Sequence, residues 1–284
     1  MVLVFLVVLA ARVDAVSTHF GKAVQSMTTS FAVSMDGVRI AYDVTGTGPA
    51  LVLLHGGGQT RRVWQEAGYV TRLSAQFRVV TMDIRGHGES DKPANVEAYA
   101  IDRLCDDILS VADAAHAKRF SVWGCSYGAN IGRYLPARSD RVTKVVIVGI
   151  SFGAAAPSPF REYALNLRGK WTPVIEADRS GTLDLHSLSE QDRALWKSGR
   201  IPLTVAQLGA ILDWPQVEPA DLRCPALWVV GTANENAMPS VNEYREGLGR
   251  TKVVLQVVPG LTHSEELTNI DDVLPPMIKF TLSP

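Results

Sequence analysis

Six short, continuous apolar runs are the feature that most limits what this chain can fold into. Helical patterns separate most of them, as where Ile101, Leu104 and Ile108 recur at spacings of three and four. Strands that are apolar on both faces are typical of a parallel sheet covered by helices on its two sides. The pattern predicts an α/β fold with a doubly wound, mostly parallel sheet. Its runs are ALVLLHG (50–56), FRVVTMDI (77–84), RFSVWGC (119–125), VTKVVIVGI (142–150), PALWVVG (225–231) and KVVLQVVPG (252–260).

Two segments depart from this alternation. FAVSMDGVRIAYDVTG (31–46) alternates apolar and polar residues around Asp36-Gly37, which predicts an antiparallel hairpin of two edge strands. Residues 152–222 carry no strand pattern and are too long for a simple loop. We expect them to form a helical lid over the ends of the strands, whose substrate-binding residues include Trp171, Trp196 and Trp214. A packing elaboration that does not touch ligand is the alternative.

The chain begins with an apolar stretch, MVLVFLVVLA, that no basic residue precedes. A signal peptide has a basic start, and a bilayer-spanning helix needs about 20 apolar residues, so neither pattern is met. We interpret residues 1–26 as an N-terminal extension that could act as a weak export or anchoring segment, and we expect no transmembrane span. The predicted core then comprises residues 27–151 and 223–284, interrupted by the lid.

Charge and cysteine content narrow the class of partner. The formal net charge is −1 and no long basic run occurs, which argues against binding to nucleic acid or to an anionic membrane. The three cysteines are odd in number and unclustered, so neither a disulfide framework nor a zinc site is indicated, and the histidines lack ligand spacing. We expect a cytoplasmic protein with no metal and no cofactor, acting on a small, largely uncharged molecule. The sequence does not indicate an oligomeric state.

The segment VWGCSYGAN (122–130) contains the strongest chemical motif. Gly124, Ser126 and Gly128 form G-x-S-x-G directly after a predicted buried strand and before a helical pattern. This strand–turn–helix context is the one in which a serine hydroxyl is presented on a sharp turn as a nucleophile, and glycines are needed where a Cβ would clash. A serine hydroxyl is a weak nucleophile at neutral pH and needs a nearby base, for which His263 is the candidate.

From about Ser30 to its C-terminus the chain resembles the α/β-hydrolase fold family. The resemblance rests on four motifs in order, HGGGQT (55–60), DIRGHGESDKP (83–93), the Ser126 motif and PGLTHSEE (259–266). It implies that Ser126 is the nucleophile, that His263 is the general base and that the backbone N–H groups of Tyr127 and Gly57 form the oxyanion hole, with Gly58 adjacent. In these motifs His55 and His87 belong to structural turns.

The third position of the expected triad departs from the family pattern. In most members the acid lies three residues after the glycine that ends the sixth parallel strand, and counting from Gly231 reaches Asn234. An asparagine carbonyl can orient an imidazole but cannot neutralise the imidazolium. Three readings stay open: Asn234 orients His263, the neighbouring Glu235 does so, or the chain is a weakened or engineered form. We favour Asn234 as the position and keep Glu235 as the second candidate.

The serine also limits the reaction. Haloalkane dehalogenases and epoxide hydrolases of this family use an aspartate at the nucleophile position, so the resemblance favours acyl transfer to water. We predict a carboxylic ester hydrolase for a small, largely apolar ester. A lactone or carbon–carbon bond hydrolase is the alternative, together with a catalytically weak member that only binds ligand.

Overall fold

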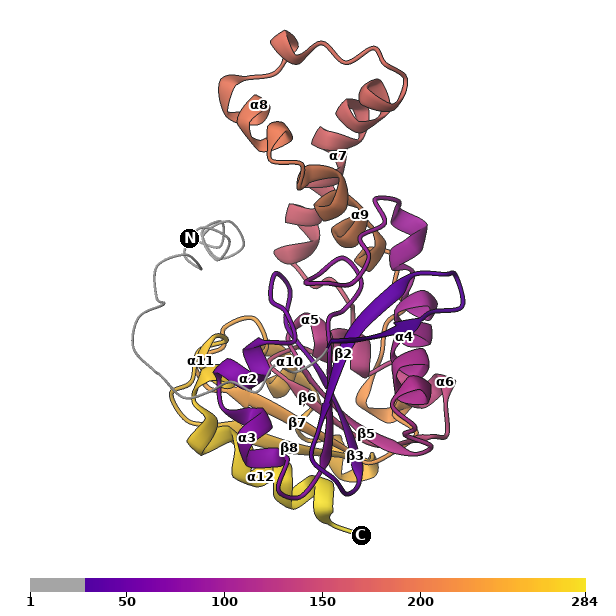
Figure 1. Cartoon of the computed structure of the whole chain (residues 1–284). Helices are drawn as coiled ribbons and strands as arrows, with labels where there is room; N and C mark the ends of the chain where they lie inside the picture. Colours follow the sequence, from indigo (N-terminus) through magenta and orange to yellow (C-terminus); the bar gives the residue numbers. More distant parts are fainter. Residues whose placement is uncertain (1–28) are drawn as a thin grey trace, which may run out of the picture.

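The structure is a computed structural model that describes residues 29–284, built around one eight-stranded sheet with helices on both sides (Figure 1). The strand order is β1-β2-β4-β3-β5-β6-β7-β8. All neighbours are parallel except β1 with β2 and β2 with β4. The α/β class, the mostly parallel sheet and the N-terminal hairpin are therefore confirmed, although of the two hairpin strands only β1 lies at an edge of the sheet, since β2 also pairs with β4. The strands are β1 (Ser30–Val33), β2 (Arg39–Thr45), β3 (Ala50–Leu54), β4 (Arg78–Met82), β5 (Phe120–Cys125), β6 (Val142–Val148), β7 (Ala226–Gly231) and β8 (Val253–Val258).

Successive side chains of the central strands point into two separate apolar cores, as the continuous apolar runs predict. In β3, Val52 and Leu54 belong to one core and Leu51 and Leu53 to the other. The first core is closed by α4 (Ile101–Ala114), α5 (Tyr127–Gly132), α6 (Leu135–Arg138) and α10 (Met238–Tyr244), and the second by α2 (Val63–Glu66), α3 (Tyr69–Leu73), α11 (Glu265–Thr268) and α12 (Ile270–Leu282). Four short 3-10 helices lie in the connections, η1 (Val96–Tyr99), η2 (Leu185–Ser187), η3 (Pro219–Asp221) and η4 (Leu248–Arg250).

A helical insertion separates β6 from β7 and stands beyond one end of the sheet (Figure 1). Its helices are α7 (Phe160–Arg179), α8 (Glu190–Lys197) and α9 (Ile201–Ile211). Two backbone hydrogen bonds between Gly153 and Val217 join the two ends of the insertion at its base. The segment that lacks strand patterning is thus helical and enters and leaves the core at one place.

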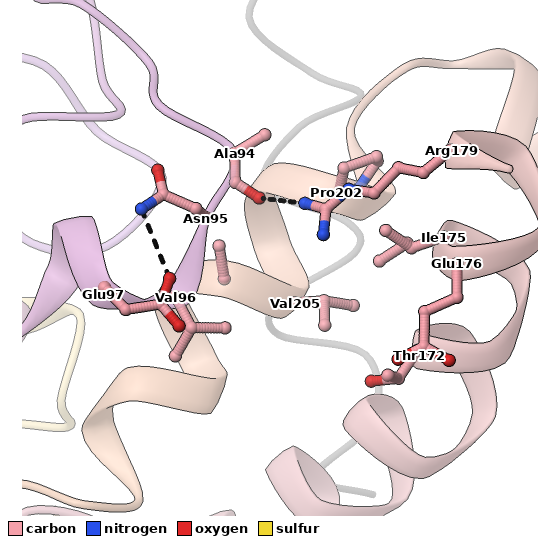
Figure 2. Close-up of a pocket in the computed structure, with 11 residues that line it drawn as sticks. Ala94, Asn95, Val96, Glu97, Thr172, Ile175, Glu176, Arg179, Pro202 and Val205 are labelled. Atoms are coloured by element: carbon pink, nitrogen blue, oxygen red, sulfur yellow. Dashed lines mark hydrogen bonds between the residues drawn. The ribbon is translucent and has the colours of Figure 1, made fainter.

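The insertion also meets the core at a small pocket of about 120 Å³ between α7, α9 and the loop that leads into η1 (Figure 2). In this pocket Arg179 of α7 reaches toward the backbone oxygen of Ala94, at 3.5 Å. Val205 of α9 and Val96 line the same pocket. The insertion is therefore in contact with the loop that follows β4.

That loop, residues 83–93, is held by two buried arginines. Arg61 binds Asp83 and, at 2.7 Å, Asp43. Arg85 binds Asp107 at 2.5 Å through one of its terminal nitrogens. A buried charge costs much free energy unless it is paired, so these ion pairs account for Asp83 and Arg85, the buried charged residues of the DIRGHGESDKP motif. The motif is a structural support beside the end of the sheet.

All three cysteines are free and buried. Over residues 29–284, no helix combines the length and the apolar character that crossing a bilayer requires. The predicted extension at residues 1–26 lies outside the described residues.

Candidate active site

Ser126 lies on a sharp turn between β5 and α5. Its φ of 51° is in the left-handed region, which a residue with a side chain rarely adopts. The flanking glycines explain why the turn forms here: a Cβ on Gly124 would overlap the backbone of Ala129, and one on Gly128 would overlap the backbone of Leu54. The geometry therefore requires the glycines of the sequence motif and presents the serine hydroxyl at the carboxyl end of β5.

His263 brings an imidazole to this hydroxyl from the loop after β8. Its Nε2 lies 3.0 Å from Ser126 Oγ, and 42% of the histidine side chain is exposed. In this geometry the hydroxyl donates to Nε2, which leaves Nδ1 to carry the ring proton. The structure thus joins two residues separated by 137 positions, as the motif order predicts.

A carboxylate that we had not predicted lies at the other side of the His263 ring. Glu266 is fully buried, and its Oε2 is 3.1 Å from His263 Nδ1. Its Oε1 accepts the backbone N–H of Gly231 at 2.7 Å, and both of its oxygens accept from Asn234 Nδ2, at 2.9 and 3.0 Å. A Cβ on Gly149 at the end of β6 would overlap Glu266 Oε2, so this glycine makes the space that the carboxylate fills.

Asn234 lies beside His263, but its orientation differs from our expectation. Its Oδ1 accepts two backbone N–H groups, those of Asn236 and Ala237, both at 3.2 Å. The amide nitrogen therefore faces the ring, 3.3 Å from His263 Nδ1. Because that nitrogen and the protonated Nδ1 are both donors, the predicted hydrogen bond from the imidazole to the asparagine carbonyl is wrong.

Glu235 does not lie beside His263 as a hydrogen-bond partner either. Its side chain is exposed and lines a pocket of about 380 Å³ together with Ser151, Asn236 and Tyr244. The backbone N–H of Glu235 bonds Ala233 O within a tight turn, which points successive side chains in different directions. The expectation that Glu235 could orient His263 is therefore not met by this geometry.

The glycine loop after β3 lies against the Ser126 turn. A Cβ on Gly56 would be 3.4 Å from Ser126 Cβ, and one on Gly57 would be 3.7 Å from Tyr127 Cβ. The N–H of Gly56 is bound by Gln59 Oε1 at 2.9 Å, and that of Gly58 by His87 Nε2 at 3.3 Å. Within the described part of the chain, the N–H groups of Gly57 and Tyr127 have no hydrogen-bond partner. Two donors beside Ser126 thus remain available.

The two histidines of these motifs hold loops in place. His55 Nδ1 lies 2.8 Å from Gly56 O, and its Nε2 accepts the N–H of Ile84 at 3.1 Å. Burial, aided by repulsion from His87, lowers the pKa of His55 to about 3. Burial also lowers the pKa of His87. Both rings are neutral at physiological pH and join the glycine loop to the loop after β4.

The three tryptophans of the insertion lie in two different environments. Trp171 is 2% exposed and stacks on Trp196 with ring centroids 6.2 Å apart, in a small core with Ile201 and Val205. Trp171 is thus enclosed within the insertion, whereas Trp196 is only partly buried, and a substrate contact of these two residues stays a prediction.

Trp214 instead lies next to the site. Its ring stacks on that of Tyr127, with centroids 6.0 Å apart, and its Nε1 donates to Tyr99 O at 3.1 Å.

Among residues 29–284, no three His, Cys, Asp or Glu side chains are grouped closely enough to hold a metal ion. The arrangement at Ser126 consists of a hydroxyl, an imidazole, a buried carboxylate and two backbone donors.

Comparison with known proteins bears on the family and the fold. The sequence profile of the family described as "alpha/beta hydrolase fold" matches residues 49–244. The pimeloyl-[acyl-carrier protein] methyl ester esterase of Vibrio vulnificus is 30% identical over 145 residues, which cover 50% of this chain and 53% of that protein. Epoxide hydrolase 4 of Mus musculus is 30% identical over 132 residues, which cover 45% of this chain and 35% of that protein. The matches thus span about half or less of the length of these relatives.

Among solved structures, the enol-lactonase of Burkholderia xenovorans LB400 superimposes with a TM-score of 0.66 at 20% identity, covering 89% of this chain and 100% of that one. At this level of identity the likeness concerns the fold. The reaction has to be argued from the site itself.

Proposed function

Because the chain belongs to the alpha/beta hydrolase fold family, we propose that it is a serine hydrolase that cleaves a small, largely apolar carboxylic ester through an acyl-enzyme. The single observation that carries this proposal is the hydroxyl–imidazole pair, with Ser126 Oγ 3.0 Å from His263 Nε2 on a strained turn. A serine paired with a base in this way is the arrangement that nucleophilic acyl transfer needs.

In the proposed reaction, Ser126 Oγ attacks the ester carbonyl carbon while its proton passes to His263 Nε2. The carbonyl oxygen becomes negative and is stabilised by the N–H groups of Gly57 and Tyr127, two donors for which residues 29–284 supply no other acceptor. Collapse of the tetrahedral intermediate breaks the bond to the alcohol, and His263 gives the proton to the departing oxygen. Water then repeats the sequence on the acyl-enzyme and releases the acid.

The serine also argues against epoxide opening, although relatives with that name exist. Attack of Ser126 Oγ on an epoxide carbon would form an ether, which has no carbonyl carbon for water to attack. Turnover would stop after one cycle. A lactone, by contrast, presents the same carbonyl group as an open ester and fits the same donors, so lactones remain within the proposed substrate class.

We also propose that the insertion acts as the lid of this site. The support lies in its contacts with the loops at the end of the sheet: Gln207 of α9 lies 3.5 Å from His87 Nδ1, and Trp214 stacks on Tyr127. These aromatic and uncharged neighbours favour an apolar substrate over an anionic one.

The Ser126→Ala variant tests the proposed function. Its hydrolysis of p-nitrophenyl butyrate should fall by several orders of magnitude, because removal of a true nucleophile leaves only binding and oxyanion contributions. A fluorophosphonate probe should add its mass to the wild-type protein and not to this variant. Ser198→Ala is the matched control, since Ser198 is an exposed serine on the insertion that bonds the backbone at Leu195. If Ser126→Ala kept more than about a tenth of the wild-type rate, Ser126 would not be the nucleophile.

A further inference from the structure

We propose that Glu266, and not a residue of the 234–235 loop, supplies the negative charge that orients and stabilises His263, and that Asn234 serves as the hydrogen-bond donor that fixes Glu266. This inference rests on the proposed function, because it concerns the base that activates Ser126. Both residues act through His263 and are positioning residues.

The first support for this inference is that His263 and Glu266 lie close together on one short helical turn. His263 and Glu266 are three residues apart where the chain enters α11, and this spacing places their side chains on the same face. The resulting distance of 3.1 Å from Nδ1 to Oε2 is that of a hydrogen bond. Since Nε2 accepts from Ser126, the Nδ1 proton is available for Glu266 to accept.

The groups around the Glu266 oxygens are all hydrogen-bond donors. Each carboxylate oxygen accepts two hydrogen bonds: Oε1 from Gly231 N–H and Asn234 Nδ2, and Oε2 from Asn234 Nδ2 and His263 Nδ1. An ionised carboxylate only accepts, so a site that offers donors alone matches the charged form and would leave a protonated carboxyl without an acceptor. The buried charge is thus satisfied by hydrogen bonds, and it gains an ionic partner when His263 takes up the Ser126 proton.

Asn234 is suited to this role as an amide. Its Oδ1 is held by two backbone N–H groups at the start of the α10 region, which fixes the direction of Nδ2 toward Glu266. Nδ2 also donates to Gly149 O at 3.3 Å. An aspartate here would place a carboxylate oxygen against both Glu266 oxygens and against Gly149 O, where only a donor fits. The asparagine is therefore the complement of a glutamate at 266 and not a weakened acid.

Four variants, compared with wild type by steady-state hydrolysis of p-nitrophenyl butyrate, test the inference. Glu266→Gln should lower kcat by a factor between about 10² and 10⁴ with a small change in KM, because an amide removes the charge and turns a donor toward the imidazole. Glu265→Gln is the matched control. Within residues 29–284 the side chain of the neighbouring Glu265 bonds only Thr262, through the threonine N–H and hydroxyl, and kcat should stay within about twofold of wild type.

If Asn234 held the place of the triad acid, Asn234→Asp would raise kcat. Our inference predicts that it lowers kcat. It removes a donor to a buried charge and adds a like charge, so kcat should fall by about tenfold. The reciprocal double variant, Asn234→Asp with Glu266→Gln, restores one charge and one donor within reach of His263. Its kcat should be at least tenfold higher than that of Glu266→Gln alone. If Glu266→Gln were inactive because its structure was lost, a second substitution would not restore activity in this way.

A spectroscopic readout separates orientation from general damage. The ¹H resonance of His263 Nδ1–H, shifted far downfield by its bond to a carboxylate, should be present in wild type and Glu265→Gln and absent in Glu266→Gln. If Glu266→Gln does not fold, Asn234→Asp decides the question. A kcat above wild type in Asn234→Asp, or a kcat within threefold of wild type in folded Glu266→Gln, would overturn the inference. Either result would leave the proposed function intact as long as Ser126→Ala is inactive, whereas an active Ser126→Ala would remove the proposed function itself.

Discussion

Gly149 offers a direct test of how tightly the site is built. It directly follows β6 and has a φ of 77°, and an added Cβ would overlap Glu266 Oε2 and lie 3.0 Å from His263 Nδ1. The Gly149→Ala substitution therefore introduces one methyl group between the carboxylate and the imidazole. It removes and replaces no polar group of the site.

The expected magnitude has two parts. An alanine in the left-handed region costs about 1–2 kcal/mol of stability, and this cost is independent of the site. The overlap with Glu266 is specific: to restore ordinary contact of about 3.5 Å, the carboxylate and the ring have to move by roughly 1 Å. Because a misplacement of this size costs on the order of 10²-fold in rate, kcat/KM of Gly149→Ala should fall by about that factor.

Gly37→Ala is the matched control for the backbone cost. Gly37 has a φ of 83° in the β1–β2 turn, and an added Cβ there meets no heavy atom within 4 Å. Urea unfolding should show a loss of about 1 kcal/mol in this variant, with kcat/KM on p-nitrophenyl butyrate unchanged. If folded Gly149→Ala kept kcat/KM within threefold of the Gly37→Ala value, the position of Glu266 against His263 would not matter for the rate, and our reasoning about the site would be refuted.

Two further predictions concern the insertion and the buried histidine. Trp171→Ala should remove about 3–5 kcal/mol of packing free energy from the small core of the insertion. Hydrogen exchange in α7 and α9 should therefore accelerate while the β-sheet amides keep their protection. Equal acceleration in the helices and the sheet would contradict a separate insertion core. The pKa of His55 in the folded protein is about 3, below the ordinary value of 6.5, chiefly through burial. The unfolded chain therefore binds the extra proton between these values, and the unfolding free energy should fall as pH decreases from 6.5 toward 3, by up to about 1.4 kcal/mol per pH unit. His55→Gln should flatten this pH dependence in urea unfolding, whereas the exposed His186→Gln should not.

The fold followed from local patterns that the sequence displays. Continuous apolar runs predicted β3 to β8. In β3 to β7 the reason is that a strand buried on both faces leaves no room for alternation, whereas β8 lies at the edge of the sheet and is partly exposed. The glycines around Ser126 predicted the sharp turn, since their missing Cβ atoms are a steric requirement of the backbone itself. The order of the motifs brought His263 to Ser126, because parallel strands deliver the loops at their carboxyl ends to one edge of the sheet.

The carboxylate partner of His263 was decided only by tertiary contacts. In the sequence, Glu266 is one of two adjacent glutamates at the start of a short helix and resembles a solvent-exposed residue. Its sole local signal is the spacing of three from His263. Whether that glutamate is buried depends on the space at Gly149 after β6, and on the N–H of Gly231 and the amide of Asn234 at the end of β7.

The environments of the tryptophans of the insertion were likewise decided by tertiary contacts and not by the sequence pattern. Sequence composition places Trp171 and Trp214 in one segment without distinguishing them. In the folded chain, α7 and α9 pack on each other and enclose Trp171, whereas the return of the chain to the core lays Trp214 on Tyr127. Backbone sterics and hydrophobic periodicity act over a few residues and can be read from the sequence, whereas the partner of a buried side chain depends on which distant segments the finished fold brings within about 4 Å.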